Sequence, residues 1–385
     1  MSWNQQTGKK FNKEIILQQV FLNQTISRNE LIENTQLKKA TVANLVNELI
    51  EEQFIIEAGK EESTGGRRPN LLKLNAQAGY ALSIDIGVNY LSGVITNLNG
   101  EIIWKVKEFI LDTTLEKYLE KIITLIHLLE QHVPPSPYHI VGLAISVPGL
   151  IDTNGIILKA SNLQWHDVDI RTLLQPYVTY PTIISNEANA GAFGEYSYTY
   201  NQQHQNLLFV SIGYGIGVGT MMNGELFLGD QGFSGESGHM IIQMDGKTCR
   251  CGRAGCWEAY ASESALVKEV ETEFTMEHVT IEDILEMTYT DDKLTPLLTN
   301  FSKYIGIGLM NLIYTFNPSK IIIGNRITLL QDQLEKPIRA YVNDKSSSFF
   351  KEDVNIEFST LDDNAILIGA ASLAINQFLL PALGQ

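Results

Sequence analysis

Apolar positions near the start of the chain recur at the spacing of helices with one buried face. Two segments show this spacing, and each predicts a helix, the first from about Asn12 to Leu22. Their apolar residues are Ile15, Ile16, Val20 and Phe21 in the first, then Val42, Leu45, Val46, Leu49 and Ile50 in the second.

A shorter helix is predicted between these two. Ser27 and Glu30 have the spacing of a capping box, in which each side chain satisfies a backbone amide of the other residue, and the helix then ends near Thr35. Two strands follow, Phe54 to Glu57 and Asn70 to Leu74, joined by the glycine-containing segment EESTGGRRP. The pattern predicts a winged helix-turn-helix domain over residues 1–75.

The pattern changes after residue 75. Apolar strands separated by short turns appear in ALSIDIGV, YLSGVITNL, EIIWKVKEFI and, after an amphipathic helix from about Leu115 to Gln131, in HIVGLAISVPG. A similar order returns in NLLFVSIGYGIGVG, MMNGELFLG and KIIIGN, before a closing helix from Ala365 to Leu380. Residues 76–385 are therefore predicted to form two α/β lobes with a cleft between them.

Charge separates the same two regions. The net charge is −16, yet residues 1–75 hold ten Lys or Arg and nine Asp or Glu, while the rest holds 18 and 35. An acidic body is repelled by phosphate, so only the head is expected to approach nucleic acid.

The predicted third helix offers a polar face suited to DNA. Asn44 has the amide that can pair with adenine, Thr41 can contact a thymine methyl group, and Lys38 and Lys39 can hold phosphates. Arg67 and Arg68 at the tip of the wing fit a minor groove or a phosphate. Helical hairpins with polar outer faces are common, and it is the basic, glycine-containing wing that favours DNA binding.

All three cysteines lie close together in TCRCGRAGCWE, after a histidine in SGHM. His239, Cys249, Cys251 and Cys256 give three thiolates and one imidazole, the ligand set of a closed structural zinc site. One Zn²⁺ per chain is therefore predicted. The alternative is a chance grouping of buried free thiols beside a histidine.

No charged and apolar leader or membrane-spanning run is seen, which favours a reduced, cytoplasmic location and thiolate ligands over disulfides.

Several motifs together resemble one known family. The head ending in GGRRP, the DIG turn, VPG, NEANAGAFGE, GFSGESGHM and CxCGxxGCWE are similar to the ROK family of repressors and sugar kinases over essentially the whole chain. The resemblance implies an actin-like, sugar kinase fold for the two lobes.

Compared with the family's kinases, this chain departs at four catalytic or phosphate-binding positions. Glu187 stands where they have an aspartate general base, and the resemblance places phosphate turns at three further segments. The first segment, Asp85-Ile-Gly87-Val88-Asn89, lacks the second glycine and the threonine of the kinase turn. In the second, Gly213-Tyr214-Gly215, a tyrosine replaces the threonine, and in the third a glycine pair is reduced to Gly324-Asn325. Because a displacement of about one ångström in a reacting group slows catalysis strongly, no kinase activity is expected.

The resemblance also implies a set of sugar-binding residues, whose amides and carboxylates suit vicinal hydroxyls. They are Asn162, Asn186, Glu236, His239 and Glu258. Asn162 as a plain turn residue and Glu258 as a hydrogen-bond partner of the metal ligands remain open alternatives. Trp165 either stacks on a sugar or belongs to a core.

These features predict a sugar-responsive transcriptional repressor. The expected partners are a palindromic operator DNA, a second copy of the chain in a homodimer, and a sugar effector, with D-xylose first and glucose second. Two alternatives stay open: a sugar kinase tethered to DNA, and a DNA-binding or scaffolding protein without a ligand.

Overall fold

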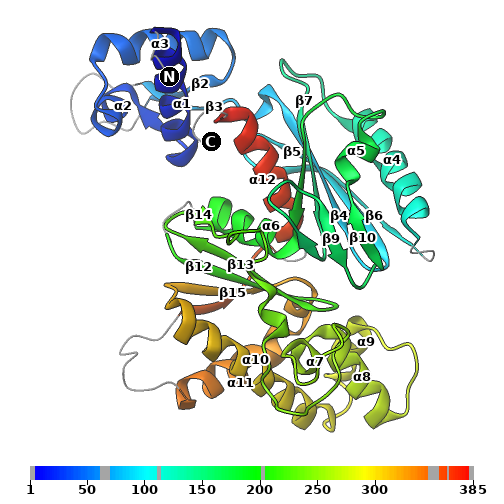
Figure 1. Ribbon diagram of the computed structural model, residues 1–385. Coiled ribbons are helices and arrows are strands. Elements are labelled where there is room, and N and C mark those ends of the chain that lie inside the picture. The colour runs from blue at the N-terminus through cyan, green and yellow to red at the C-terminus, as the bar shows by residue number, and fades with distance from the viewer. Residues whose placement is uncertain are drawn as a thin grey trace.

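The computed structural model describes residues 5–60, 70–110, 114–200, 204–345, 355–361 and 364–380. Figure 1 shows a small head beside two larger lobes, with the C-terminal helix running between them. Within the described residues, no helix is both long and apolar enough to cross a membrane.

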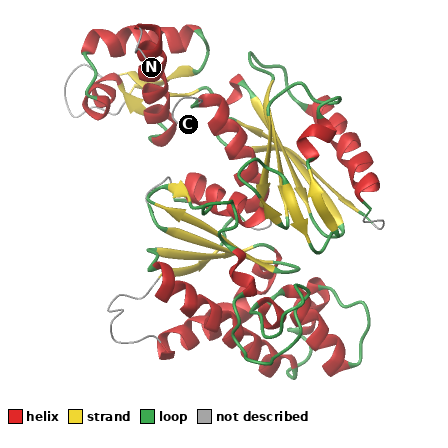
Figure 2. Cartoon of the chain, viewed as in Figure 1, coloured by secondary structure: helices red, strands yellow, loops and turns green. Residues whose placement is uncertain are grey.

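The head contains three helices and a small sheet, as Figure 2 shows by colour. Its strands pair in the order β1-β3-β2, all antiparallel. The elements are α1 (Gln5–Leu22), β1 (Ile26–Ser27), α2 (Arg28–Thr35), α3 (Lys39–Glu51), β2 (Ile55–Lys60) and β3 (Asn70–Leu74). The predicted helix-turn-helix with two wing strands is present, and β1 adds a third strand.

Local chemistry explains where these helices begin. The capping box of Ser27 and Glu30 forms as predicted and starts α2. Helix α1 begins at Gln5, earlier than the predicted Asn12, since the preceding residues are polar and leave no apolar stripe to detect. Its first half is tied to α3 by ion pairs from Lys9 and Lys13 to Glu48.

The N-terminal lobe is built on a five-stranded sheet in the order β11-β7-β4-β5-β6. Three strands form an antiparallel meander, and β7 and β11 add in parallel. Its strands are β4 (Tyr80–Ile86), β5 (Tyr90–Asn97), β6 (Ile102–Phe109), β7 (Ile140–Val147) and β11 (Thr182–Asn186). Helix α4 (Leu115–His132) buries its apolar stripe against this sheet, close to its predicted bounds.

A second, smaller sheet in this lobe was not foreseen. It has the order β10-β9-β8, with β8 (Leu150–Ile151), β9 (Ile157–Ala160) and β10 (Trp165–Val168), and is followed by α5 (Ile170–Leu174). Its strands are too short to show a clear alternation of apolar and polar residues.

The C-terminal lobe repeats the larger sheet in the order β14-β13-β12-β15-β16. Here β12, β13 and β14 are antiparallel, and β15 and β16 are parallel additions. The strands are β12 (Leu207–Ile212), β13 (Ile216–Met222), β14 (Glu225–Leu226), β15 (Lys320–Gly324) and β16 (Asn355–Phe358). This recurrence is the duplicated α/β architecture that the sequence pattern predicted.

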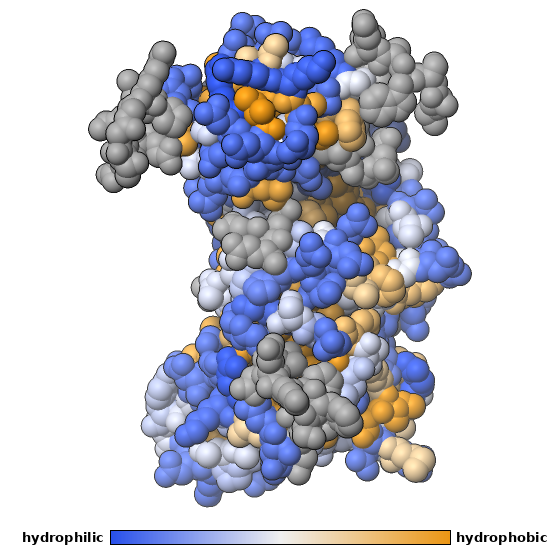
Figure 3. Space-filling model, turned by 90° about the vertical axis from the view of Figure 1, so that its left-hand side faces the viewer, coloured by the Kyte–Doolittle hydropathy of each residue, from blue (hydrophilic) through white to orange (hydrophobic). Residues whose placement is uncertain are grey.

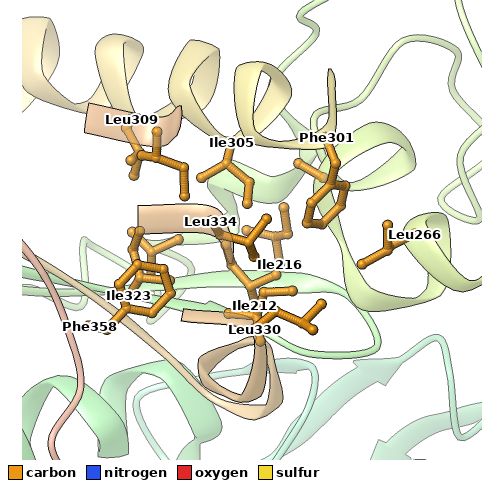
Figure 4. Close-up of a cluster of buried hydrophobic side chains, with 14 of the residues drawn as sticks. Ile212, Ile216, Leu266, Phe301, Ile305, Leu309, Ile323, Leu330, Leu334 and Phe358 are labelled. Atoms are coloured by element: carbon orange, nitrogen blue, oxygen red, sulfur yellow. The ribbon is translucent and has the colours of Figure 1, made fainter. Parts of the chain in front are cut away.

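Helices cover the second sheet with a continuous apolar core. Figure 4 shows side chains from strands and helices converging, among them Ile212, Ile323, Phe301 and Leu334. The helices of this lobe are α7 (Glu258–Ala261), α8 (Glu263–Phe274), α9 (Ile281–Met287), α10 (Leu294–Phe316) and α11 (Gln331–Lys345). On the molecular face drawn in Figure 3, hydrophilic side chains predominate and apolar ones form smaller patches.

Helices α6 (Glu187–Gly194) and α12 (Ala365–Leu379) pack against each other between the sheets. Their backbones touch so closely that a Cβ on Gly369 would lie 1.8 Å from the Ala190 carbonyl oxygen. A π-helical turn, η2 (Glu195–Thr199), continues α6.

The head packs on α12 rather than standing apart from the body. Its buried residues form one cluster with Ile375 and Leu379 of α12. The ring of Phe54 stacks on Tyr138 with centroids 4.6 Å apart and lies 5.7 Å from the ring of Phe378. Helix α12 therefore contacts both α6 and the head.

Candidate functional site

Four ligand-type side chains come together beside the second sheet. His239 ends a short 3-10 helix, η3 (Glu236–His239), and the cysteines follow in a loop that turns at Gly252 and Gly255, both with positive φ. The ligand atoms of His239, Cys249, Cys251 and Cys256 all lie within 4.8 Å of one another.

Distances inside this group suit a tetrahedral ion. Cys251 Sγ lies 3.6 Å from Cys256 Sγ, and Cys249 Sγ lies 3.6 Å from His239 Nδ1. Ligands about 2.3 Å from zinc at tetrahedral angles are separated by about 3.8 Å. Burial raises the pKa of Cys249 and of Cys256, whereas hydrogen bonds from Arg253 and the two neighbouring thiols lower the pKa of Cys251 to about 6 against its own burial. One thiolate is therefore favoured without a metal, and the other two thiols would lose their protons on binding one. The residues present fit a closed zinc site.

His239 uses its two ring nitrogens in different directions. Nδ1 faces the thiol of Cys249, and Nε2 lies 3.7 Å from Glu236 Oε2. The Glu236 side chain remains 43% exposed, and desolvation raises its pKa against the opposing effect of His239. One imidazole thus joins the cluster of cysteines to a carboxylate that lies outside it.

Glu258, the first residue of α7, connects the cysteine loop to strand β13. Its Oε2 accepts a hydrogen bond from the Ile216 backbone N–H at 3.2 Å, and its Oε1 lies 3.6 Å from Cys249 Sγ. Gly215 makes room for this carboxylate, because a Cβ there would lie 2.3 Å from Glu258 Oε2. Glu258 therefore contacts a metal-ligand candidate directly, as the alternative of a hydrogen-bond partner of the metal ligands would require.

Asn186 caps helix α6. Its Oδ1 accepts hydrogen bonds from the backbone N–H groups of Ala188 and Asn189, and its Nδ2 donates to the carbonyl of Gly149 in the VPG turn. The second hydrogen on Nδ2 is the donor that this amide has left over. The capping role was not anticipated from the sequence.

Glu187 follows Asn186 as the first residue of α6. Its Oε1 accepts a hydrogen bond from Ser211 Oγ at 3.3 Å. Desolvation, and after it the negative charges of Asp85, Glu258 and Glu236, raises the pKa of Glu187 to about 8. We call Asp85, Glu187, Glu236 and Glu258, which interact electrostatically in this way, the interlobe site.

Asn162 belongs to the other lobe, in the turn between β9 and β10, so the turn alternative describes its location correctly. Its Oδ1 accepts a hydrogen bond of 2.8 Å from Arg250 Nη1, which lies in the cysteine loop. Trp165 is a core residue: it is 3% exposed and packs edge-on against Tyr118.

Two tyrosine side chains pack against the turn that includes Asp85 and Gly87. Tyr90 donates a hydrogen bond to Asp85 Oδ2 at 2.8 Å, and its ring stands where a Cβ on Gly87 would be, 2.1 Å away. The Tyr118 hydroxyl lies 2.9 Å from the carbonyl oxygens of both Gly87 and Val88.

The other two turns are filled in a similar way. Asn325 Nδ2 donates to Ser211 Oγ at 2.9 Å and stands against Gly213, where an added Cβ would approach it to 2.7 Å. The guanidinium of Arg250 covers the Tyr214 ring at 3.9 Å. Neither Arg250 nor Tyr90 was singled out from the sequence, because their contacts arise only on folding.

A cavity of about 1000 Å³ opens on the outer side of the cysteine loop. Of the predicted sugar-binding residues only Glu258 lines it. The interlobe site includes Glu236 and Glu258 of that set, His239 Nε2 lies next to Glu236, and Asn186 directly precedes Glu187 in the chain.

The predicted DNA-binding residues lie in the head. Lys38, Lys39 and Asn44 are exposed at the start of α3 and along its outer face, and Thr41 is half-buried. Arg67 and Arg68 lie outside the described residues.

A model of the ROK family matches residues 81–377. The chain belongs to the ROK family. The membership inferred from the motifs is thereby confirmed, and the matched residues begin just after the head.

Two ROK relatives match nearly the whole chain. The xylose repressor of Bacillus spizizenii is 40% identical over 372 residues, which span 96% of each chain. The crystal structure of a ROK family transcriptional regulator, a homolog of the E. coli MLC protein, superposes with a TM-score of 0.81 at 25% identity, covering 97% of this chain and 98% of that one. The predicted fold class is confirmed by this likeness.

A ROK kinase matches a smaller share. The glucokinase of Streptomyces griseus, solved with glucose and AMPPNP, gives a TM-score of 0.70 at 24% identity, covering 77% of this chain and 99% of that one. This likeness shows the shared fold of the two lobes.

Proposed function

We propose that the chain is a sugar-responsive transcriptional repressor whose effector is D-xylose, and that it controls genes of xylose use. The proposal rests on a contrast. Carboxylates, amides and an imidazole have polar atoms left near the cysteine cluster. The three turns that the ROK resemblance assigns to phosphate are instead packed against Tyr90, Asn325 and Arg250. The named repressors that match nearly the full chain support the same reading.

In this proposal, one zinc ion is held by His239, Cys249, Cys251 and Cys256, and it braces one wall of the sugar site. The ion's role is structural, since four protein ligands leave no position for water. Fixing the His239 ring through Nδ1 leaves Nε2 directed toward Glu236 and the effector.

Sugar hydroxyls would be bound by Asn162, Asn186, Glu236, His239 and Glu258. Carboxylates accept from neighbouring hydroxyls, and the remaining amide hydrogens of Asn162 and Asn186 donate to sugar oxygens. A site built from carboxylates and amides rejects analogues that lack a hydroxyl, because its own polar groups are then left unpaired.

We further propose that the chain has no kinase activity. Glu187 stands where the ROK kinases have an aspartate base, and its extra methylene displaces the carboxylate by roughly one ångström, a shift that slows catalysis strongly. Tyr90 and Asn325 occupy the turns that the ROK resemblance assigns to phosphate. The carboxylates of the interlobe site also repel a triphosphate.

Residues 1–75 would bind the operator, as a DNA-binding domain beside the sugar-sensing region of residues 76–385. Lys38 and Lys39, exposed at the N-terminal end of α3, would contact phosphates, with Thr41 and Asn44 reading base edges. Arg67 and Arg68 would extend this contact from the wing. A C2 homodimer would present two heads to a palindromic operator with half-sites a whole number of helical turns apart, about 34 to 36 Å each.

The proposal is tested by selecting DNA from a random pool with the full chain, then measuring release by D-xylose, D-glucose and L-arabinose. A palindromic sequence that only D-xylose releases is the expected result. Recovery of no preferred sequence, or binding unaffected by every sugar, would overturn the repressor assignment. A coupled ATP assay with the same sugars should show no turnover, and a rate near the enzyme median of about 10 per second would establish a kinase instead.

A further inference from the structure

Arg250 makes a hydrogen bond between the two lobes. It stands between two metal-ligand candidates, Cys249 and Cys251, in the C-terminal lobe. Its Nη1 donates a hydrogen bond of 2.8 Å to Asn162 Oδ1, across to the β9–β10 turn of the N-terminal lobe. The two residues are 88 positions apart in sequence.

The C-terminal lobe holds the guanidinium of Arg250 in place by two further contacts. Nη2 donates a hydrogen bond of 2.6 Å to Ser264 Oγ, and the guanidinium covers the Tyr214 ring at 3.9 Å from its centroid. Ser264 Oγ in turn donates to the Tyr214 carbonyl oxygen at 2.7 Å. A planar group held by stacking and by a hydrogen bond presents its remaining N–H groups in a fixed direction.

This contact decides how Asn162 can meet a ligand. An asparagine side chain has one acceptor oxygen and two amide hydrogens. Arg250 donates to the oxygen, so the two hydrogens on Nδ2 are the donors that this amide has left.

We propose that Arg250 is a positioning residue, which latches the β9–β10 turn to the cysteine loop and orients the Asn162 amide toward the effector. The proposal rests on the proposed sugar-binding function. Sugar and latch both favour the arrangement in which the lobes are close, so each strengthens the other. The contact is exposed to solvent, which limits its contribution to a moderate one.

Three variants separate the latch from the sugar contact. Arg250→Ala removes the latch and keeps the Asn162 donor. Asn162→Asp keeps a partner for Arg250, as a carboxylate, and removes the donor. Lys268→Ala is the matched control, since it also removes one exposed positive charge beside the same outer cavity.

Xylose affinity, measured by calorimetry, should fall by about two- to fivefold in Arg250→Ala. A larger fall is expected in Asn162→Asp, and none in Lys268→Ala. Arg250→Lys should recover part of the loss, because an ammonium keeps the charge without the planar fork. In a double-mutant cycle of Arg250→Ala, Asn162→Ala and the double variant, the two losses of xylose affinity should be less than additive. Zinc content is measured for each variant, so that a damaged metal loop is recognised by metal loss.

Hydrogen exchange in the absence of sugar tests the latch by itself. Amides of residues 157–168 should exchange several-fold faster in Arg250→Ala than in the wild type, and at the wild-type rate in Asn162→Asp and Lys268→Ala. Equal exchange in Arg250→Ala and the wild type, or full additivity in the double variant, overturns the latch. If the wild type binds no aldose, the proposed function fails, and the exchange experiment still decides whether the latch exists.

Discussion

Glu236 and His239, next to the cysteines, form what we call the metal side of the interlobe site. The Glu236 side chain is 43% exposed and His239 directs Nε2 toward it, so polar atoms remain for a ligand. The turns at Asp85 and Gly213 differ. There Tyr90 donates a hydrogen bond to Asp85, and Asn325 donates one to Ser211, so these polar atoms already have partners within the chain. Under the proposed function, the fold has kept the side chains that bind a polyol and has lost the turns that bind phosphate. We infer that binding and catalysis are separable because they depend on different walls of the same region.

The largest effect should follow from breaking the metal side. Cys256 is fully buried, and Cys256→Ser is expected to remove zinc and destabilise the chain by about 4 kcal/mol or more, the range seen when a structural metal is lost. Metal analysis and urea unfolding measure both changes. Met244→Ser, at an exposed position of the same segment, should keep zinc and stability. A zinc-free wild type, or a Cys256→Ser variant as stable as the wild type, would refute the structural role.

Removing the negative charge of Glu236 tests whether the metal side binds the sugar. Hydrogen bonds to charged groups contribute about 1.5 to 3 kcal/mol, so Glu236→Gln should weaken xylose binding by about tenfold to a hundredfold. Calorimetry measures this affinity. Sugar-free operator binding and zinc content should be unchanged, and the exposed Glu277→Gln serves as the control. Wild-type xylose affinity in Glu236→Gln would remove this residue from the sugar site.

The head provides a contrast of its own between base and phosphate contacts. Asn44→Ala should cost about 1 to 3 kcal/mol on the operator and relax preference at one base pair. Lys38→Ala should weaken all sequences alike and reduce the salt slope by about one. Titrations of labelled DNA at several salt concentrations distinguish the two. Unchanged affinity and preference in Asn44→Ala would show that α3 presents a different face to DNA.

A further prediction concerns Glu187 and the dependence of stability on pH. The folded chain keeps the Glu187 proton up to about pH 8, whereas the unfolded chain loses it near 4.5. The folded state therefore binds the extra proton between these values, and its contribution to stability falls as pH rises through this window. Urea unfolding at several pH values should give a shallower decline for Glu187→Gln than for the wild type. Parallel curves would show that Glu187 ionises normally.

The sequence predicted those parts of the molecule that depend on local spacing. Ser27 and Glu30 form their capping box, and His239 meets the cysteines because short intervals and glycine turns keep the ligands together. Contacts made across the fold were not predictable in this way. Asn162 and Arg250 meet only after two lobes assemble, and α1 extends to Gln5 through a polar segment whose lysines pair with α3.

Some residues have a second role that their sequence context did not reveal. Asn186 caps α6 while keeping one amide hydrogen, and Glu258 approaches Cys249 while accepting from Ile216. In both cases folding determines how many hydrogen-bonding groups a side chain has left. The residue type alone gives only the total number.

The central claim, that sugar and operator are coupled through one chain, is tested by measuring xylose affinity with and without saturating operator DNA. Helix α12 contacts both α6, which begins at Glu187, and the head, so a change at the sugar site has a packed route to the DNA-binding surface. If xylose releases the operator by a factor of a hundred, the coupling is about 2.7 kcal/mol. Reciprocity then requires operator DNA to weaken xylose binding by the same hundredfold. Equal xylose affinities in the two conditions would contradict the account.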